Sequence, residues 1–117
     1  MSEFIDVDAL GQLKEFIAEK FPEVVDIFIR TSEGYVRDIV SGFGDKDVQR
    51  VIDAAHPLKS SSGNLGLVRL GSLCGDVEDL GIKIIKGEAS FDELGPFIGQ
   101  MQDVYSRSLE LLRAELD

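Results

Sequence analysis

The chain has 117 residues, 44% hydrophobic and 29% charged, a balance typical of one globular domain and not of a disordered segment. Twenty-two acidic against twelve basic side chains give a net charge of −10, which disfavours nucleic acid and anionic membranes as partners. One cysteine excludes an intrachain disulfide and a multi-cysteine metal site. Because we find neither a secretion signal nor a bilayer-length apolar run, we expect a cytoplasmic domain.

The first half of the chain predicts two amphipathic helices, because apolar residues recur there at steps of three and four. The first covers about residues 8–20. Pro22 suits the first turn of the second, where its missing N–H would have no partner, and the apolar spacing extends to about residue 42 or 43. The sequence G-F-G-D at 42–45 is a break, and Asp45 is predicted to cap the next helix.

Three more helices are predicted in the second half. The third runs from Val48 to the S-G-N-L-G stretch, where Asn64 and Gly66 tolerate the left-handed conformation of a C-terminal cap. The fourth covers about 67–85. Ser90 and Glu93 fit a capping box that opens the last helix, which runs nearly to the C-terminus.

These elements predict an all-α fold, an antiparallel up-down four-helix bundle with an additional N-terminal helix. We expect residues 1–117 to form a single domain with a bundle core of about 22–116. Cys74 falls within an apolar stripe, so a buried small side chain is favoured over a redox sensor.

The stretch A-A-H-P-L-K-S-S-S-G at 54–63 contains the single histidine, His56. On a helix, Lys59 lies about 60° and Ser60 about 40° around the axis from His56, and Gly63 lies two turns further on the same side. A neutral imidazole is a nucleophile near pH 7, and a lysine one turn away can stabilise the oxygens of a phosphoryl group. Small side chains at Ser60 and Gly63 leave room for a second protein to dock.

The pattern A-H-x-L-K-x-S-S-x-x-L-G, followed by L-x-x-L-C-x-x-x-E, resembles the histidine-containing phosphotransfer (HPt) domain of multistep phosphorelays. The matching residues are Ala55, His56, Leu58, Lys59, Ser61, Ser62, Leu65, Gly66, Leu70, Leu73, Cys74 and Glu78. The resemblance implies that His56 accepts a phosphoryl group from an aspartate of a receiver domain and passes it to another receiver, with Lys59 stabilising the phosphate. It also implies a Mg²⁺ ion bound by the receiver, and no metal or cofactor on this chain.

Two residues depart from the family pattern. Ser60 stands where the family commonly has glycine; it is still small, and its hydroxyl can bond a phosphate oxygen. Pro57 inside a helix would remove one backbone hydrogen bond, at a cost of roughly 3 kcal/mol, and bend the helix. The alternative is that the helix restarts at Pro57.

The remaining alternatives concern Glu78 and the function itself. Glu78 is either an exposed glutamate or a carboxylate that orients the imidazole from the fourth helix.

The leading hypothesis is a monomeric phosphocarrier that binds receivers of response regulators, a hybrid sensor kinase, or both. It is not an enzyme, since the chain has no G-x-x-x-x-G-K loop and no room for an ATP-binding domain. A scaffold that docks a receiver without phosphorylation is the alternative, and acid–base or metal catalysis by the lone histidine ranks last.

Overall fold

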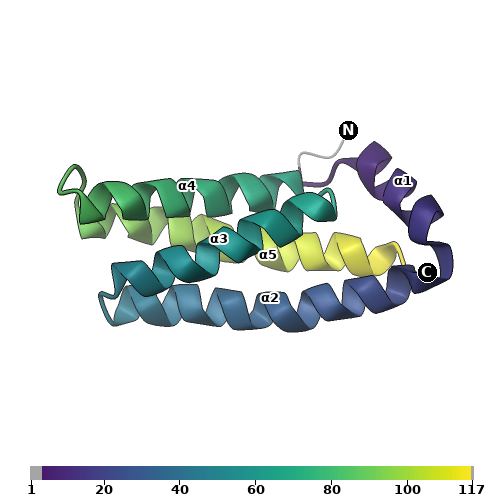
Figure 1. Ribbon diagram of the computed structural model, residues 1–117, viewed down its shortest axis with the longest axis horizontal. Coiled ribbons are helices and arrows are strands. Elements are labelled where there is room, and N and C mark those ends of the chain that lie inside the picture. Colours follow the sequence, from purple (N-terminus) through teal and green to yellow (C-terminus); the bar gives the residue numbers. More distant parts are fainter. Residues whose placement is uncertain (1–3, 117) are drawn as a thin grey trace.

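The computed structural model of the chain describes residues 4–116, and these residues form helices joined by short connections (Figure 1). The helices are α1 (Val7–Ile17), η1 (Ala18–Lys20), α2 (Phe21–Gly44), α3 (Val48–Asn64), α4 (Val68–Ile85), η2 (Phe91–Glu93) and α5 (Leu94–Ala114), where η denotes a short 3-10 helix. Among the described residues there is no β-strand. The prediction of an all-α protein is therefore confirmed.

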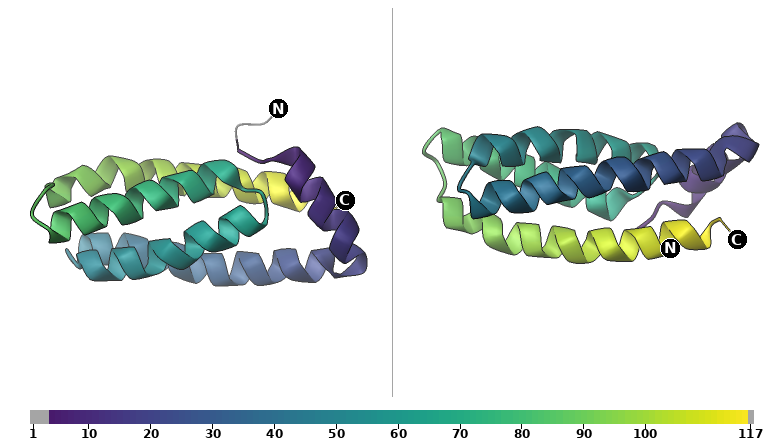
Figure 2. Two further views of the ribbon diagram at one scale, coloured as in Figure 1. Left: turned by 45° about the horizontal axis from the view of Figure 1, so that its top comes forward. Right: turned by 90° about the horizontal axis from the view of Figure 1, so that it is seen from below.

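The four long helices α2 to α5 lie side by side and run in alternating directions (Figures 1 and 2). α3 packs against both α2 and α4, α4 packs against α5, and contacts between α2 and α5 close the ring. Short connections force this antiparallel order, because each helix must return along the one before it. In the part of the chain that is described, no helix is both long enough and apolar enough to cross a bilayer.

α1 lies at one end of the bundle, near the connection between α3 and α4 (Figure 1). The Asp6 amide donates a hydrogen bond to the Gly66 carbonyl over 2.7 Å, and the Lys14 ammonium donates to the Glu115 carbonyl over 2.7 Å. Gly66 has a φ of +72°, and a β-carbon there would lie 3.1 Å from the carbonyl oxygen of Asp6. Glycine at 66 therefore permits both the turn after α3 and its contact with the segment before α1.

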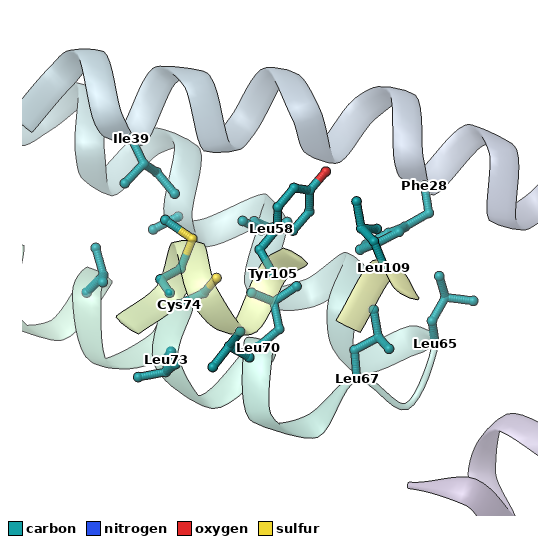
Figure 3. Close-up of a cluster of buried hydrophobic side chains, with 14 of the residues drawn as sticks. Phe28, Ile39, Leu58, Leu65, Leu67, Leu70, Leu73, Cys74, Tyr105 and Leu109 are labelled. Atoms are coloured by element: carbon teal, nitrogen blue, oxygen red, sulfur yellow. The ribbon is translucent and has the colours of Figure 1, made fainter. Parts of the chain in front are cut away.

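The apolar stripes of the helices point into one continuous core (Figure 3). Its fully buried members include Leu58 from α3, Leu70 and Cys74 from α4, and Met101 from α5. The core position predicted for Cys74 is confirmed. Burial raises the pKa of its thiol from 9.0 to about 12, because the thiolate would lose its hydration.

The helix ends agree with the predicted capping residues in part. The capping box of Ser90 and Glu93 is present, and Pro22 lies in the first turn of α2. The prediction that Asp45 caps α3 is wrong: Asp47 does so, accepting a hydrogen bond from the Arg50 amide over 3.1 Å. α2 continues to Gly44, so Asp45 instead ends α2, with its amide bonded to the Ser41 carbonyl over 2.9 Å.

Candidate functional site

His56 lies in the middle of α3 with 67% of its side chain exposed. Its neighbours Ala55 and Leu58 are fully buried, so the apolar stripe of α3 holds the helix in the bundle and turns the imidazole outward. α3 is a single helix from Val48 to Asn64 and contains Pro57 in its interior. The alternative of a helix restart at Pro57 is therefore wrong. Of the two residues predicted to tolerate a left-handed conformation after α3, Gly66 adopts it and Asn64 is helical. In the described chain only Ala18, Lys46 and two glycines have positive φ.

Glu78 reaches His56 from the neighbouring helix α4. The imidazole Nδ1 lies 2.5 Å from Oε2 of Glu78, whose side chain is only 13% exposed. A carboxylate can only accept a hydrogen bond, so this contact assigns the proton to Nδ1. The other ring nitrogen, Nε2, has no hydrogen-bond partner among the described residues, and the exposed side of the ring therefore carries a free lone pair.

Lys59 lies beside the same carboxylate. Its Nζ is 3.7 Å from Oε1 of Glu78, and its side chain is half exposed. The two oxygens of Glu78 thus face the imidazole and the ammonium of α3 at once. One partly buried carboxylate on α4 therefore bonds the imidazole and lies near the ammonium of α3.

Ser60 and Gly63 lie on the exposed outer side of α3. The Ser60 hydroxyl is 3.5 Å from the carbonyl oxygen of His56, a long contact that leaves the hydroxyl able to rotate. A β-carbon at Gly63 would meet no atom within 4 Å. The surface of α3 next to the imidazole, at Ser60 and Gly63, is therefore open and carries only small side chains, and it does not form a pocket.

Sequence reasoning missed Gly75 of α4. A β-carbon at this position would lie 3.6 Å from both Cδ and Cε of Lys59. The signal that could have found it is the G-x-x-x-G spacing of Gly71 and Gly75 on the helix that follows the histidine helix, since small residues one turn apart mark a close helix contact. Within residues 4–116, no group of three or more His, Cys, Asp or Glu side chains is placed to hold a metal ion.

Comparison with known families identifies the class of protein that this fold and site define. The Hpt domain family model matches residues 23–117, which is most of the chain, and the chain therefore belongs to the Hpt domain family. Members of this family are phosphocarrier modules of phosphorelays and interact with receiver domains of response regulators and hybrid kinases. Membership of this family supports a histidine phosphotransfer role for the domain. α1 lies outside the matched segment.

Individual relatives agree with this assignment. The chain is similar to histidine-containing phosphotransfer protein B (HptB) from Pseudomonas aeruginosa PAO1, with 25% identity and a TM-score of 0.87 over 98% of this chain and 96% of that one. It is also 23% identical, over 94% of its length, to the aerobic respiration control sensor protein ArcB of Escherichia coli K12 and of Shigella flexneri. The chain spans only 14% of the length of these sensor proteins.

Proposed function

We propose that Nε2 of His56 accepts a phosphoryl group from the phospho-aspartate of a receiver domain and delivers it to the aspartate of another receiver. The observation that carries this proposal is that the two nitrogens of the imidazole have different environments. Nδ1 is engaged by Glu78 at 2.5 Å, while 67% of the His56 side chain is exposed and Nε2 has no partner among the described residues. A protonated, oriented Nδ1 leaves the lone pair on the nitrogen that an incoming protein can reach.

The transfer step needs no co-reactant. The Nε2 lone pair attacks phosphorus, the P–O bond to the receiver aspartate breaks, and the carboxylate leaves with that electron pair. The ring becomes an imidazolium that keeps its Nδ1 proton, and the Glu78 carboxylate at 2.5 Å balances its charge. The reverse sequence returns the phosphoryl group to an aspartate and restores a neutral imidazole, so transfer is reversible.

Lys59 and Ser60 are proposed to stabilise the phosphoryl oxygens. Lys59 Nζ lies 3.7 Å from Glu78, beyond hydrogen-bond distance, and half of its side chain is exposed, so its ammonium is available to an arriving anion. The Ser60 hydroxyl is held only by a 3.5 Å contact to the His56 carbonyl and can rotate toward a phosphate oxygen. Glu78 is proposed to act through the imidazole as a positioning residue.

The docking surface is proposed to be the open side of α3 at Ser60 and Gly63, where neither side chain obstructs approach. The proposed partners are receivers of response regulators and a hybrid sensor kinase, the second because the ArcB relatives are sensor proteins by name.

The Mg²⁺ ion for the exchange is assigned to the receiver, and no cofactor to this chain. We further propose a monomeric, cytoplasmic protein in which residues 1–117 form one HPt-like domain, with α1 an addition to the four-helix bundle.

The test is phosphoryl transfer from a panel of phosphorylated receiver domains to the wild type and to His56→Gln. The wild type is expected to gain acid-labile, alkali-stable label, and the variant none. Because His56 is exposed, the variant should unfold at the same temperature as the wild type, which excludes a folding defect. If a receiver binds the wild type without labelling it, the phosphocarrier role is contradicted and a docking scaffold takes its place. If a receiver labels His56→Gln as strongly as the wild type, His56 is not the phosphoryl acceptor.

A further inference from the structure

The side chain of Lys59 does not extend freely into solvent but lies against α4. A β-carbon added at Gly75 would be 3.6 Å from Cδ, 3.6 Å from Cε and 4.0 Å from Nζ of Lys59. Those distances place the last carbons of the lysine side chain directly over the bare backbone of Gly75. Any side chain longer than alanine at this position would compete with Lys59 for the same space.

Glu78 lies one turn further along α4, on the same side as Gly75. Its Oε1 is 3.7 Å from Lys59 Nζ, and its Oε2 is 2.5 Å from His56 Nδ1. The aliphatic part of the Lys59 side chain therefore lies against Gly75, and its ammonium lies near the carboxylate of Glu78. Because Glu78 also bonds the imidazole, the ammonium lies close to the nitrogen that reacts, while the 3.7 Å separation leaves it available to a phosphoryl group.

We propose that α4 positions the phosphate-stabilising cation of α3, and that Gly75 is a positioning residue for phosphoryl transfer that acts through Lys59. This inference rests on the proposed function, since it concerns the cation of the same site. A lysine side chain loses considerable conformational freedom when it is held in one place. A surface that already confines the stem reduces the freedom that Lys59 must lose when a phosphoryl group arrives.

Gly71, one turn earlier on α4, provides a comparison on the same helix. A β-carbon there would lie 3.6 Å from the backbone carbonyl of Lys59, 3.8 Å from the amide nitrogen of Gly63 and 3.8 Å from Cβ of Ser62. Gly71 thus faces the backbone of α3 and not the lysine side chain. Both glycines permit close helix packing, but only Gly75 lies under the cation.

The experiment is a double-mutant cycle between Gly75→Leu and Lys59→Ala, read as the rate of transfer from a receiver that labels the wild type. Gly75→Leu displaces the lysine stem and should slow transfer by up to about thirtyfold, the loss expected for Lys59→Ala. In the Lys59→Ala background it should cause no further loss, because the group through which it acts is gone. Gly71→Ala fits at ordinary contact distances against the backbone of α3 and should stay within about twofold of the wild type.

The outcomes separate this inference from the proposed function. If the wild type is labelled on His56 but Gly75→Leu transfers at the wild-type rate, or slows transfer equally with and without Lys59, Gly75 does not act through the cation. Should Gly75→Leu fail to fold, nuclear Overhauser contacts between the Gly75 α-protons and the Lys59 δ- and ε-protons of the wild type test the same geometry. Their presence supports the inference, and their absence overturns it even if phosphotransfer occurs.

Discussion

Among the polar contacts that join helices of this bundle, two hydrogen bonds differ mainly in where they lie. On the α3–α4 side, His56 pairs with Glu78 over 2.5 Å, with most of the imidazole exposed. On the α2–α5 side, the hydroxyls of Ser32 and Tyr105 share a 2.7 Å hydrogen bond, and both residues are buried. Burial also raises the pKa of the Tyr105 phenol, an effect that the Ser32 hydrogen bond partly offsets.

The two hydrogen bonds are therefore expected to differ in their effect, one on the stability of the bundle and the other on its chemistry. The Ser32 hydroxyl is the hydrogen-bond partner of the Tyr105 hydroxyl in the interior, so loss of this pair should lower the stability of the bundle. The His56–Glu78 pair lies at the surface, where water can replace a lost hydrogen bond, so its loss should alter chemistry more than stability. Changes at Lys59, Cys74, Tyr105 and Ser60 separate effects on phosphoryl transfer from effects on stability, from the largest expected effect to the smallest.

Lys59→Ala should slow phosphoryl transfer by about thirtyfold, equivalent to ~2 kcal/mol, because one charge-assisted contact to the phosphoryl oxygens is lost. Receiver docking should weaken much less, since Lys59 acts on the charge that arrives and not on the docking surface. Single-turnover rates measured over a range of receiver concentrations separate the two effects. Lys59→Arg is the matched control, because it retains the positive charge. Equal losses in docking and in transfer would contradict the assignment.

Cys74 contrasts with His56 because it is a titratable group within the core. Its pKa is raised by burial from 9.0 to about 12, so the folded chain keeps the thiol proton where the unfolded chain loses it. The thiol's contribution to stability is therefore fully present below pH 9 and lost as the pH rises toward 12. By pH 10 this loss is on the order of 1 kcal/mol.

Urea unfolding of the wild type and Cys74→Ala at pH 7.5 and pH 10 measures this loss. The difference in free energy of unfolding between the two proteins should fall by that amount as the pH rises. The comparison removes the contributions of tyrosines and lysines, which titrate in both proteins. An unchanged difference would show that Cys74 titrates alike in the folded and unfolded chains.

Tyr105→Phe should lower the free energy of unfolding by about 1 kcal/mol, because Ser32 loses one buried partner. The loss is limited since Ser32 still contacts the carbonyl of Ile29 at 3.2 Å. Phosphoryl transfer should be unaffected. Tyr35→Phe, on the partly exposed side of α2, is the matched control and should change stability by less than about 0.5 kcal/mol. A slower transfer in Tyr105→Phe would break the division between the two contacts.

Much of this fold could be predicted because periodic apolar spacing is a local property of the sequence. The helical segments and the capping box at Ser90 follow from residues close together in the chain. The cap at Asp45 was predicted wrongly because α2 continues through Gly44, and the choice between two nearby aspartates depends on where the preceding helix stops. Pro57 in a continuous helix was also undecided, since only packing of α3 on both sides shows that the helix persists there.

The candidate site, too, could be predicted only in part. His56, Lys59, Ser60 and Gly63 share one helix, so their grouping on one side follows from the helical repeat. The position of Glu78 beside His56 depends on how the turn at Gly66 returns the chain, and the sequence offered it only as one of two alternatives. Gly75 was missed because a glycine carries no side chain to signal a role. What it provides is space for Lys59, and that space exists only once α3 and α4 are packed.

Ser60→Ala should have the smallest effect, a reduction of about threefold in the transfer rate, because a neutral hydroxyl contributes about one weak hydrogen bond to the phosphoryl group. Alanine favours the helix more than serine does, so the free energy of unfolding should rise by a few tenths of a kcal/mol. A variant that is more stable yet slower cannot owe its defect to folding. Ser61→Ala, on the half-buried neighbour, is the control and should transfer at the wild-type rate. If both variants match the wild type, the Ser60 hydroxyl stays with the His56 carbonyl during transfer, and Lys59 alone stabilises the phosphoryl oxygens from α3.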